Sequence, residues 1–85
     1  MAYVDPIPEL KRQLGAELAS LVTGWNADDI AYLLQTDRSR IADLRHQKLD
    51  RFSLETLIRF ATRLGKRVEL GIASPPLFAR MRKKE

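Results

Sequence analysis

The 85-residue chain contains no cysteine and a single histidine, His46. The first absence excludes disulfides and cysteine-based zinc sites, and one histidine alone is too few ligands for a metal site. The chain also has no apolar run near the roughly 18 residues that a membrane-spanning helix needs, and no signal-peptide pattern. We therefore expect a cytoplasmic protein that binds no metal and no membrane.

The sequence also lacks the residue patterns on which enzymes depend. We find no nucleophile paired with a base, no glycine-rich phosphate loop and no carboxylate cluster with metal-binding spacing. The prediction is a protein without catalytic residues and without a cofactor.

Charge is unevenly distributed along the chain. Residues 1–65 carry nine basic and nine acidic side chains, so the net charge of +4 arises entirely from residues 66–85. Within the balanced part, residues 38–51 still hold five basic side chains against two acidic ones. Two basic zones on a neutral body favour a nucleic-acid partner, although the same charges are also those of an ordinary soluble surface.

Helical spacing of apolar residues predicts helices over residues 9–22 and 54–64. Ser53 is placed to cap the second of these, and Gly65 to end it. Gly15 interrupts the first helix, where it either weakens the helix or permits another segment to approach closely.

Between these two helices, residues 26–47 predict two short helices joined by a tight turn. Asn26 and Asp37 are suited to cap them. Trp25 and Phe52 each precede a cap at the spacing of a hydrophobic staple, in which the residue before the cap packs on the fourth residue of the helix.

The apolar positions of these short helices indicate which sides are buried. Ala31 and Leu34 on the first, with Ile41 and Leu44 on the second, are predicted to face the core. The second helix then presents its polar residues to solvent, namely Arg38, Ser39, Arg40, Asp43 and Arg45. A short helix that offers Arg and Ser outward suits the DNA major groove.

After Gly65 the period changes to two. Val68, Leu70 and Ile72 alternate with Arg67, Glu69 and Gly71, which predicts a one-sided strand. No second strand is predicted in the sequence, so the backbone groups of this strand need a partner from elsewhere. We expect the strand to pair with the same strand of a second copy. The three apolar residues, Val68, Leu70 and Ile72, are the predicted dimerisation residues.

The order of elements, with Ala31, Ile41 and Leu44 at these places, resembles the phage-repressor/Cro-like (XRE) helix-turn-helix family. The run KLDRFSLETLIRFATRLGKRVEL, residues 48–70, is similar to its branch of small regulators and Hig-type antitoxins. The resemblance covers about residues 10–72. Three positions depart from it: Gln35 and Gln47 stand where glycine is usual, and Ala27 stands where a phosphate-contacting glutamine is common.

Together these observations predict an all-α fold, a four-to-five-helix repressor-like helix-turn-helix domain with one C-terminal β-strand that pairs across a dimer. The predicted divisions are an N-terminal arm (1–8), a helix-turn-helix DNA-binding domain (9–65), a dimerisation strand (66–73) and a basic tail (74–85). The tail is either a short helix or disordered.

The resemblance implies two groups of DNA contacts. Base readout falls to Arg38, Ser39, Arg40 and Asp43, with Arg38 suited to a bidentate pair with guanine. Asp43 either accepts from cytosine or forms an ion pair with Arg40. Phosphate contacts, which position the helix without reading sequence, fall to Arg45, His46, Lys48 and Arg51.

The predicted function is that of a DNA-binding transcriptional regulator, most often a repressor, that acts as a homodimer on a palindromic operator of double-stranded DNA. The alternative is an antitoxin that neutralises a ribonuclease-type toxin by direct protein binding and autoregulates its operon. RNA binding ranks third, because no aromatic stacking platform is visible.

Overall fold

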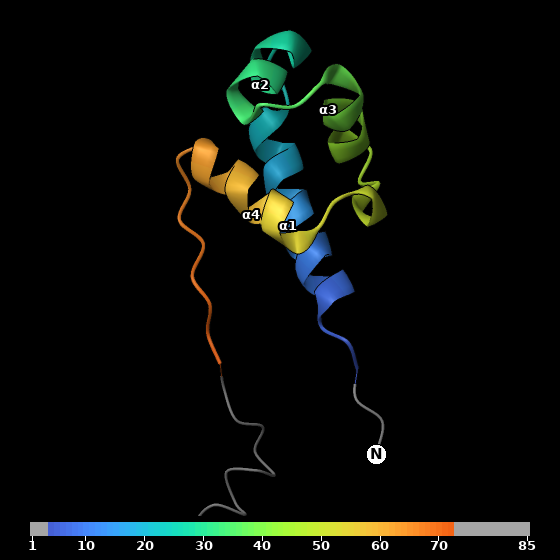
Figure 1. Ribbon diagram of the computed structural model, residues 1–85, viewed down its shortest axis with the longest axis vertical. Helices are drawn as coiled ribbons and strands as arrows, with labels where there is room; N and C mark the ends of the chain where they lie inside the picture. The colour runs from blue at the N-terminus through green and yellow to red at the C-terminus, as the bar shows by residue number, and fades with distance from the viewer. Residues whose placement is uncertain (1–3, 73–85) are drawn as a thin grey trace, which may run out of the picture.

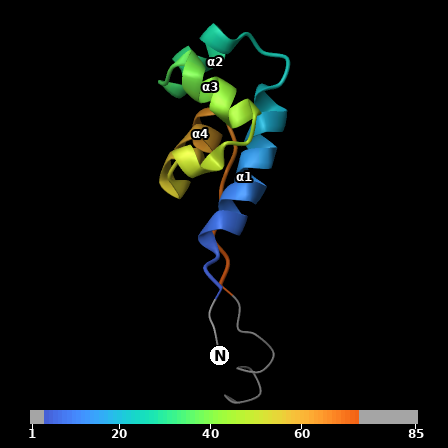
Figure 2. The same cartoon turned by 90° about the vertical axis from the view of Figure 1, so that its right-hand side faces the viewer.

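The structure is a computed structural model that describes residues 4–72. This part of the chain contains α1 (Ile7–Val22), α2 (Ala27–Leu34), α3 (Arg38–Arg45), the 3-10 turn η1 (Leu49–Arg51) and α4 (Leu54–Arg63). The long α1 runs through the molecule, α2 and α3 lie at one of its ends, and α4 packs across it (Figure 1). A quarter turn brings α3 to the front, so α3 forms an outer side of the molecule (Figure 2). The helical class and the two short central helices are therefore confirmed.

The three predicted N-caps are confirmed. Asn26, Asp37 and Ser53 each accept a hydrogen bond from a backbone N–H in the first turn of α2, α3 and α4, at 2.8, 2.9 and 3.1 Å. The first N–H groups of a helix have no partner within it, so a side-chain acceptor at this position stabilises the helix start. The caps therefore determine where the three helices begin.

α1 begins two residues earlier than predicted, at Ile7. Pro6 stands at the cap and Pro8 in the first turn, where a helix has unpaired N–H groups and proline is tolerated. Residues 7 and 8 of the predicted arm thus belong to the helix. Residues 1–3 lie outside the described part of the chain.

Two glutamines adopt the left-handed backbone conformation that glycine favours. Gln35 follows α2 with φ 57°, and Gln47 follows α3 with φ 59°. A residue with a Cβ pays about 1 kcal/mol for this conformation. At Gln47 the side chain offsets that cost, because Nε2 donates to the carbonyl oxygens of Gly15 at 3.0 Å and of Leu44 at 3.1 Å.

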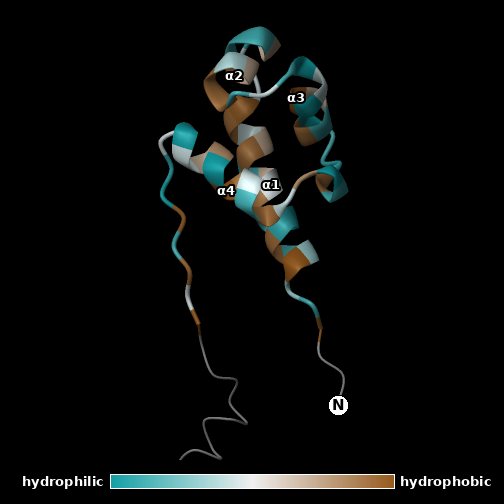
Figure 3. Cartoon of the chain, viewed as in Figure 1, coloured by the Kyte–Doolittle hydropathy of each residue, from teal (hydrophilic) through white to brown (hydrophobic). Residues whose placement is uncertain are grey.

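Gly65 follows the C-cap of α4, as predicted, with φ 81° and a hydrogen bond of 2.9 Å from the Lys66 N–H to the Ala61 carbonyl. Beyond it, hydrophilic and hydrophobic residues alternate along the segment 66–72 (Figure 3). No strand is assigned among the described residues, because a strand requires a paired neighbour and this segment has none between residues 4 and 72. The strand and its pairing across a dimer remain predictions, and residue 73 and the tail 74–85 lie outside the described part.

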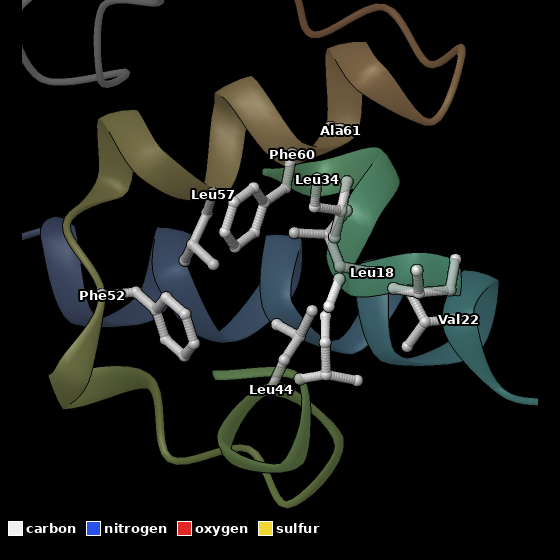
Figure 4. Packing of buried hydrophobic residues seen from close by; sticks show 11 residues of the cluster. Leu18, Val22, Leu34, Leu44, Phe52, Leu57, Phe60 and Ala61 are labelled. Carbon is white, nitrogen blue, oxygen red and sulfur yellow. The ribbon is translucent and has the colours of Figure 1, made fainter. Parts of the chain in front are cut away.

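A single hydrophobic core joins the four helices (Figure 4). The predicted inward residues of α2 and α3 are all buried in it. Phe60 of α4 is a core residue that the sequence reasoning missed, and its ring lies edge-on to that of Phe52 with centroids 6.0 Å apart. The full cluster consists of Leu18, Val22, Ile30, Ala31, Leu34, Ile41, Leu44, Phe52, Leu57, Phe60 and Ala61.

The two predicted hydrophobic staples differ in burial. Phe52 is 3% exposed and Leu57 is fully buried. At the other site Ile30 is buried, but the Trp25 side chain is 60% exposed. Trp25 is therefore a surface residue whose side chain contributes little to the core.

Gly15 allows η1 to pack directly on α1. A Cβ at this position would lie 2.6 Å from Cδ2 of Leu49, closer than carbon atoms approach without a shift. Of the two predicted reasons for this glycine, the structure supports close approach.

Within residues 4–72, no helix combines the length and the apolar character needed to cross a lipid bilayer.

Candidate nucleic-acid interface

The exposed side of α3 is the centre of the candidate interface. Ile41 and Leu44 are fully buried. At about 100° per residue, the side opposite them is formed by Ser39, Ala42 and Asp43. This side is free of large apolar groups, so it can face a polar partner.

Arg38 lies at the start of α3 and is well exposed. Its Nε lies 3.3 Å from Oδ1 of Asp28, and the two side chains are 74% and 67% exposed. An ion pair this accessible contributes at most about 1 kcal/mol. The pair links the first turns of α2 and α3, and it leaves the Arg38 guanidinium able to exchange its partner.

Arg40, by contrast, turns toward η1 and α4. Its Nη1 donates to the carbonyl oxygen of Arg51, and its Cζ lies 5.3 Å from the centroid of the Phe52 ring. A guanidinium over an aromatic face is attracted by the negative charge of the ring. Arg40 is thus on a flank of α3, apart from Ser39 on its outer side.

Asp43 pairs with Arg51. Arg51 Nη1 lies 3.0 Å from Asp43 Oδ1, and the Asp43 side chain is only 15% exposed. The sequence left cytosine or Arg40 as the partner of this carboxylate, and the structure shows a third, Arg51. A predicted base reader and a predicted phosphate contact are therefore joined in one ion pair that ties α3 to η1.

Arg45 occupies the opposite flank and faces the turn between α1 and α2. Its Nη2 donates to the carbonyl oxygens of Trp25 at 2.6 Å and of Val22 at 3.3 Å. Val22 is the last residue of α1 and Trp25 lies in the turn before α2, so these bonds tie α3 to the connection between the two helices. The structure gives this predicted phosphate contact a bracing position between helices.

His46 and Lys48 lie in the turn that follows α3. His46 is the C-cap of α3 and Lys48 precedes η1, and both are exposed. Neither side chain has a hydrogen bond or ion pair to any residue in the described range. Their polar ends are available at the C-terminal end of α3.

One positioning residue escaped the sequence reasoning. Arg63 of α4 donates from Nη1 to the Leu34 carbonyl at 2.9 Å, which satisfies the C-terminal end of α2. Its partner lies 29 residues away in the chain, so no local pattern could have indicated it. The end of α2, which precedes the turn to α3, is consequently held by a contact from α4.

Residues 8–73 match the sequence profile of a protein family described as a helix-turn-helix domain. The match includes α2, α3 and α4 and all but the first residue of α1. No curated protein and no solved structure matches the chain significantly.

Proposed function

The chain belongs to a family of helix-turn-helix domains, and we propose that it is a sequence-specific DNA-binding regulator that inserts α3 into the major groove. The observation that carries the proposal is the exposed polar side of α3, which is held by an N-cap at Asp37 and by Arg45, while Arg63 braces the end of the preceding α2. A rigid helix of this kind positions base-reading side chains with little loss of conformational entropy. The proposal involves no catalysis and no cofactor.

Arg38 and Ser39 are the proposed base readers. They occupy the first two positions of α3, and both are exposed. Arg38 fits guanine through two parallel hydrogen bonds, and the Asp28 carboxylate holds the guanidinium until DNA replaces it. Arg40 and Asp43 act in this proposal mainly by positioning, since each already binds a protein group.

Phosphate contacts are proposed for Lys48, His46 and the outward part of Arg51. All three lie between the end of α3 and the start of α4, next to a helix N-terminus whose N–H groups also favour phosphate. Such contacts add affinity without sequence preference. The excess of positive charge that follows α4 supplements them.

We further propose that the regulator is a homodimer that acts as a repressor and binds an operator with two half-sites about one helical turn apart. One copy offers few phosphate contacts, and the segment 66–72 carries apolar side chains that are uncovered in the single chain. Pairing of this segment with its own copy brings two α3 helices to the same DNA. We expect the protein to act in the cytoplasm, at the nucleoid, where this DNA lies.

Selection of bound fragments from random duplex DNA, followed by affinity measurements over a range of salt, tests the proposal. Arg38→Ala should relax base preference at one position of each half-site, a loss of about 1–3 kcal/mol of discrimination. Lys48→Ala should weaken all sequences alike and lower the log–log salt slope by about 1.

Two results would contradict the proposed function. The first is the absence of any salt-dependent binding to duplex DNA by the unmodified chain. The second is an unchanged base preference in Arg38→Ala, which would remove α3 from the reading face while leaving general DNA binding possible.

A second candidate is an antitoxin that binds a ribonuclease-type toxin and autoregulates its operon. The observation in its favour is the set of exposed apolar side chains outside α3, including Tyr32 at 88% and Leu70 at 85%. Apolar groups left in water favour a protein partner. Co-expression with the product of the neighbouring gene tests this role: a stable complex supports it, and a locus without such a gene argues against it.

A further inference from the structure

A polar groove lies beside α3, between the end of α2, the turn that follows it and α4. Its volume is about 500 Å³, within the roughly 300–1,000 Å³ typical of ligand sites. Four arginines line it, Arg40, Arg51, Arg59 and Arg63, and no carboxylate does so among the described residues. Four like charges around one hollow repel one another unless an anion enters, so the groove is suited to a negatively charged group.

The contacts of these arginines leave most of their charge uncompensated. Only Arg51 has a carboxylate partner within residues 4–72, Asp43 at 3.0 Å. Arg40 and Arg63 are held instead by backbone carbonyls, which fix the guanidinium groups without neutralising them. Each guanidinium has five N–H donors, so N–H groups beyond those used in these bonds remain free in the groove and are already held in position.

Neutral donors complete the groove. The hydroxyls of Ser53 and Thr56 lie 2.8 Å apart at its wall, at the start of the ten-residue helix α4. The positive end of the helix dipole at this place adds to the attraction for an anion. Arginine, hydroxyl and helix N-terminus together provide the donor set that suits phosphate oxygens.

We propose that this arginine groove binds a phosphate group, carried either by a small phosphorylated molecule or by the DNA backbone. The groove lies on the Arg40 flank of α3, about 100° around the helix from Ser39, so its occupant does not cover the base-reading side. A small phosphorylated molecule bound there would be an effector, and this source does not depend on the proposed DNA function. Binding of a backbone phosphate rests on that function.

The first part of the test titrates the purified chain with pyrophosphate at constant ionic strength and measures binding by calorimetry and amide NMR shifts. The test variant is Arg59→Gln, because Arg59 is exposed and has no side-chain bond to the rest of the described chain, so we expect its replacement to leave the fold intact. The matched control is Arg12→Gln, which removes the same charge from α1, where Arg12 pairs with Glu9 away from the groove. We expect pyrophosphate to bind, Arg59→Gln to weaken it about tenfold, and Arg12→Gln to leave it unchanged.

The second part measures the salt dependence of duplex DNA binding for the same proteins. If the groove takes a backbone phosphate, Arg59→Gln lowers the log–log slope by about 0.9 relative to Arg12→Gln. Pyrophosphate binding without a change of slope assigns the groove to a small molecule, and a change of slope, with or without pyrophosphate binding, assigns it to the DNA backbone. The proposal is overturned if neither occurs, or if both variants have equal effects. A chain that binds no DNA at all contradicts the proposed function, while the pyrophosphate result still decides the groove.

Discussion

At the scale of single residues, arginine serves two purposes in this protein. Arg45 and Arg63 donate to backbone carbonyls at the ends of other helices. Arg38 and Arg59 have no such bond and are exposed. In the sequence all four arginines look alike, because the backbone partners of Arg45 and Arg63 come from distant parts of the chain. Only the first pair is therefore expected to matter for folding.

Replacing Arg45 by lysine distinguishes two roles of this residue, a structural brace between helices and a phosphate contact. Lysine retains the charge, but its Nζ ends a shorter side chain and does not reach the place of Nη2, which donates to both carbonyls, so the free energy of unfolding should fall by about 1 kcal/mol. Urea unfolding measures this change. Arg38→Lys, which disturbs only an exposed ion pair, is the control and should be nearly neutral. Arg45 acts chiefly on DNA if its lysine variant is fully stable but binds duplex DNA less tightly.

The two left-handed glutamines provide a matched pair of glycine substitutions. Gln35→Gly relieves backbone strain, and we expect a gain of up to about 1 kcal/mol in stability. Gln47→Gly relieves the same strain but loses two side-chain hydrogen bonds, so we expect a loss of about 1 kcal/mol. Thermal and urea unfolding of both variants check the difference. Equal gains at both positions would show that the Gln47 hydrogen bonds contribute nothing.

At the scale of helices and turns, the close approach of η1 to α1 determines how α4 begins. Gly15 provides the space into which Leu49 packs, and Phe52 then enters the core directly after η1. Since Ser53 caps α4 immediately afterwards, the start of α4 and one wall of the arginine groove follow directly after this contact. The lack of a side chain at Gly15 is thus what allows Leu49 to approach α1 so closely.

A double-mutant cycle tests this contact. Gly15→Ala improves helix propensity by about 1 kcal/mol, but its Cβ displaces Leu49, so no gain in stability is expected in the natural chain. In a Leu49→Ala background the clash is absent, and the same substitution should stabilise by about 1 kcal/mol. Chemical denaturation of the four proteins gives the coupling energy. Identical effects in both backgrounds would argue against the contact.

At the scale of the whole molecule, the segment 66–72 leaves apolar side chains and backbone groups uncovered. Val68, Leu70 and Ile72 are 42%, 85% and 91% exposed, on a segment whose backbone has no ladder partner within residues 4–72. Burying such residues against a second copy removes apolar surface from water and pairs the free backbone groups. The proposed dimer would also place two recognition helices on one face.

Sedimentation equilibrium tests the dimer. Val68→Pro removes a ladder N–H and should convert a dimer to a monomer, with a roughly palindromic operator then bound much more weakly. Val68→Thr keeps the N–H and the branched side chain and should remain dimeric. An unchanged mass in the proline variant would exclude pairing through this segment.

Much of the fold could be predicted from the sequence because its determinants are local. A cap at Asn26, Asp37 or Ser53 acts within three residues, and the burial of Ile41 and Leu44 follows from helical spacing alone. The start of α1 was predicted two residues too late, and the burial of Phe60 was missed. Proline is tolerated in the first turn of a helix but does not require one, and an aromatic residue at the edge of an apolar stripe can lie on either side.

The sequence by itself determined the four helices, the starts of α2, α3 and α4, the inward faces of α2 and α3, and the positive charge of α3 and of the C-terminal part. Only the tertiary structure decided what each charge does. It joined Asp43 to Arg51, turned Arg40 onto Phe52, and used Arg45 and Arg63 as braces. The physical reason is range: caps and periodicity act over a few residues, whereas ion pairs and carbonyl contacts depend on where packing brings distant segments together.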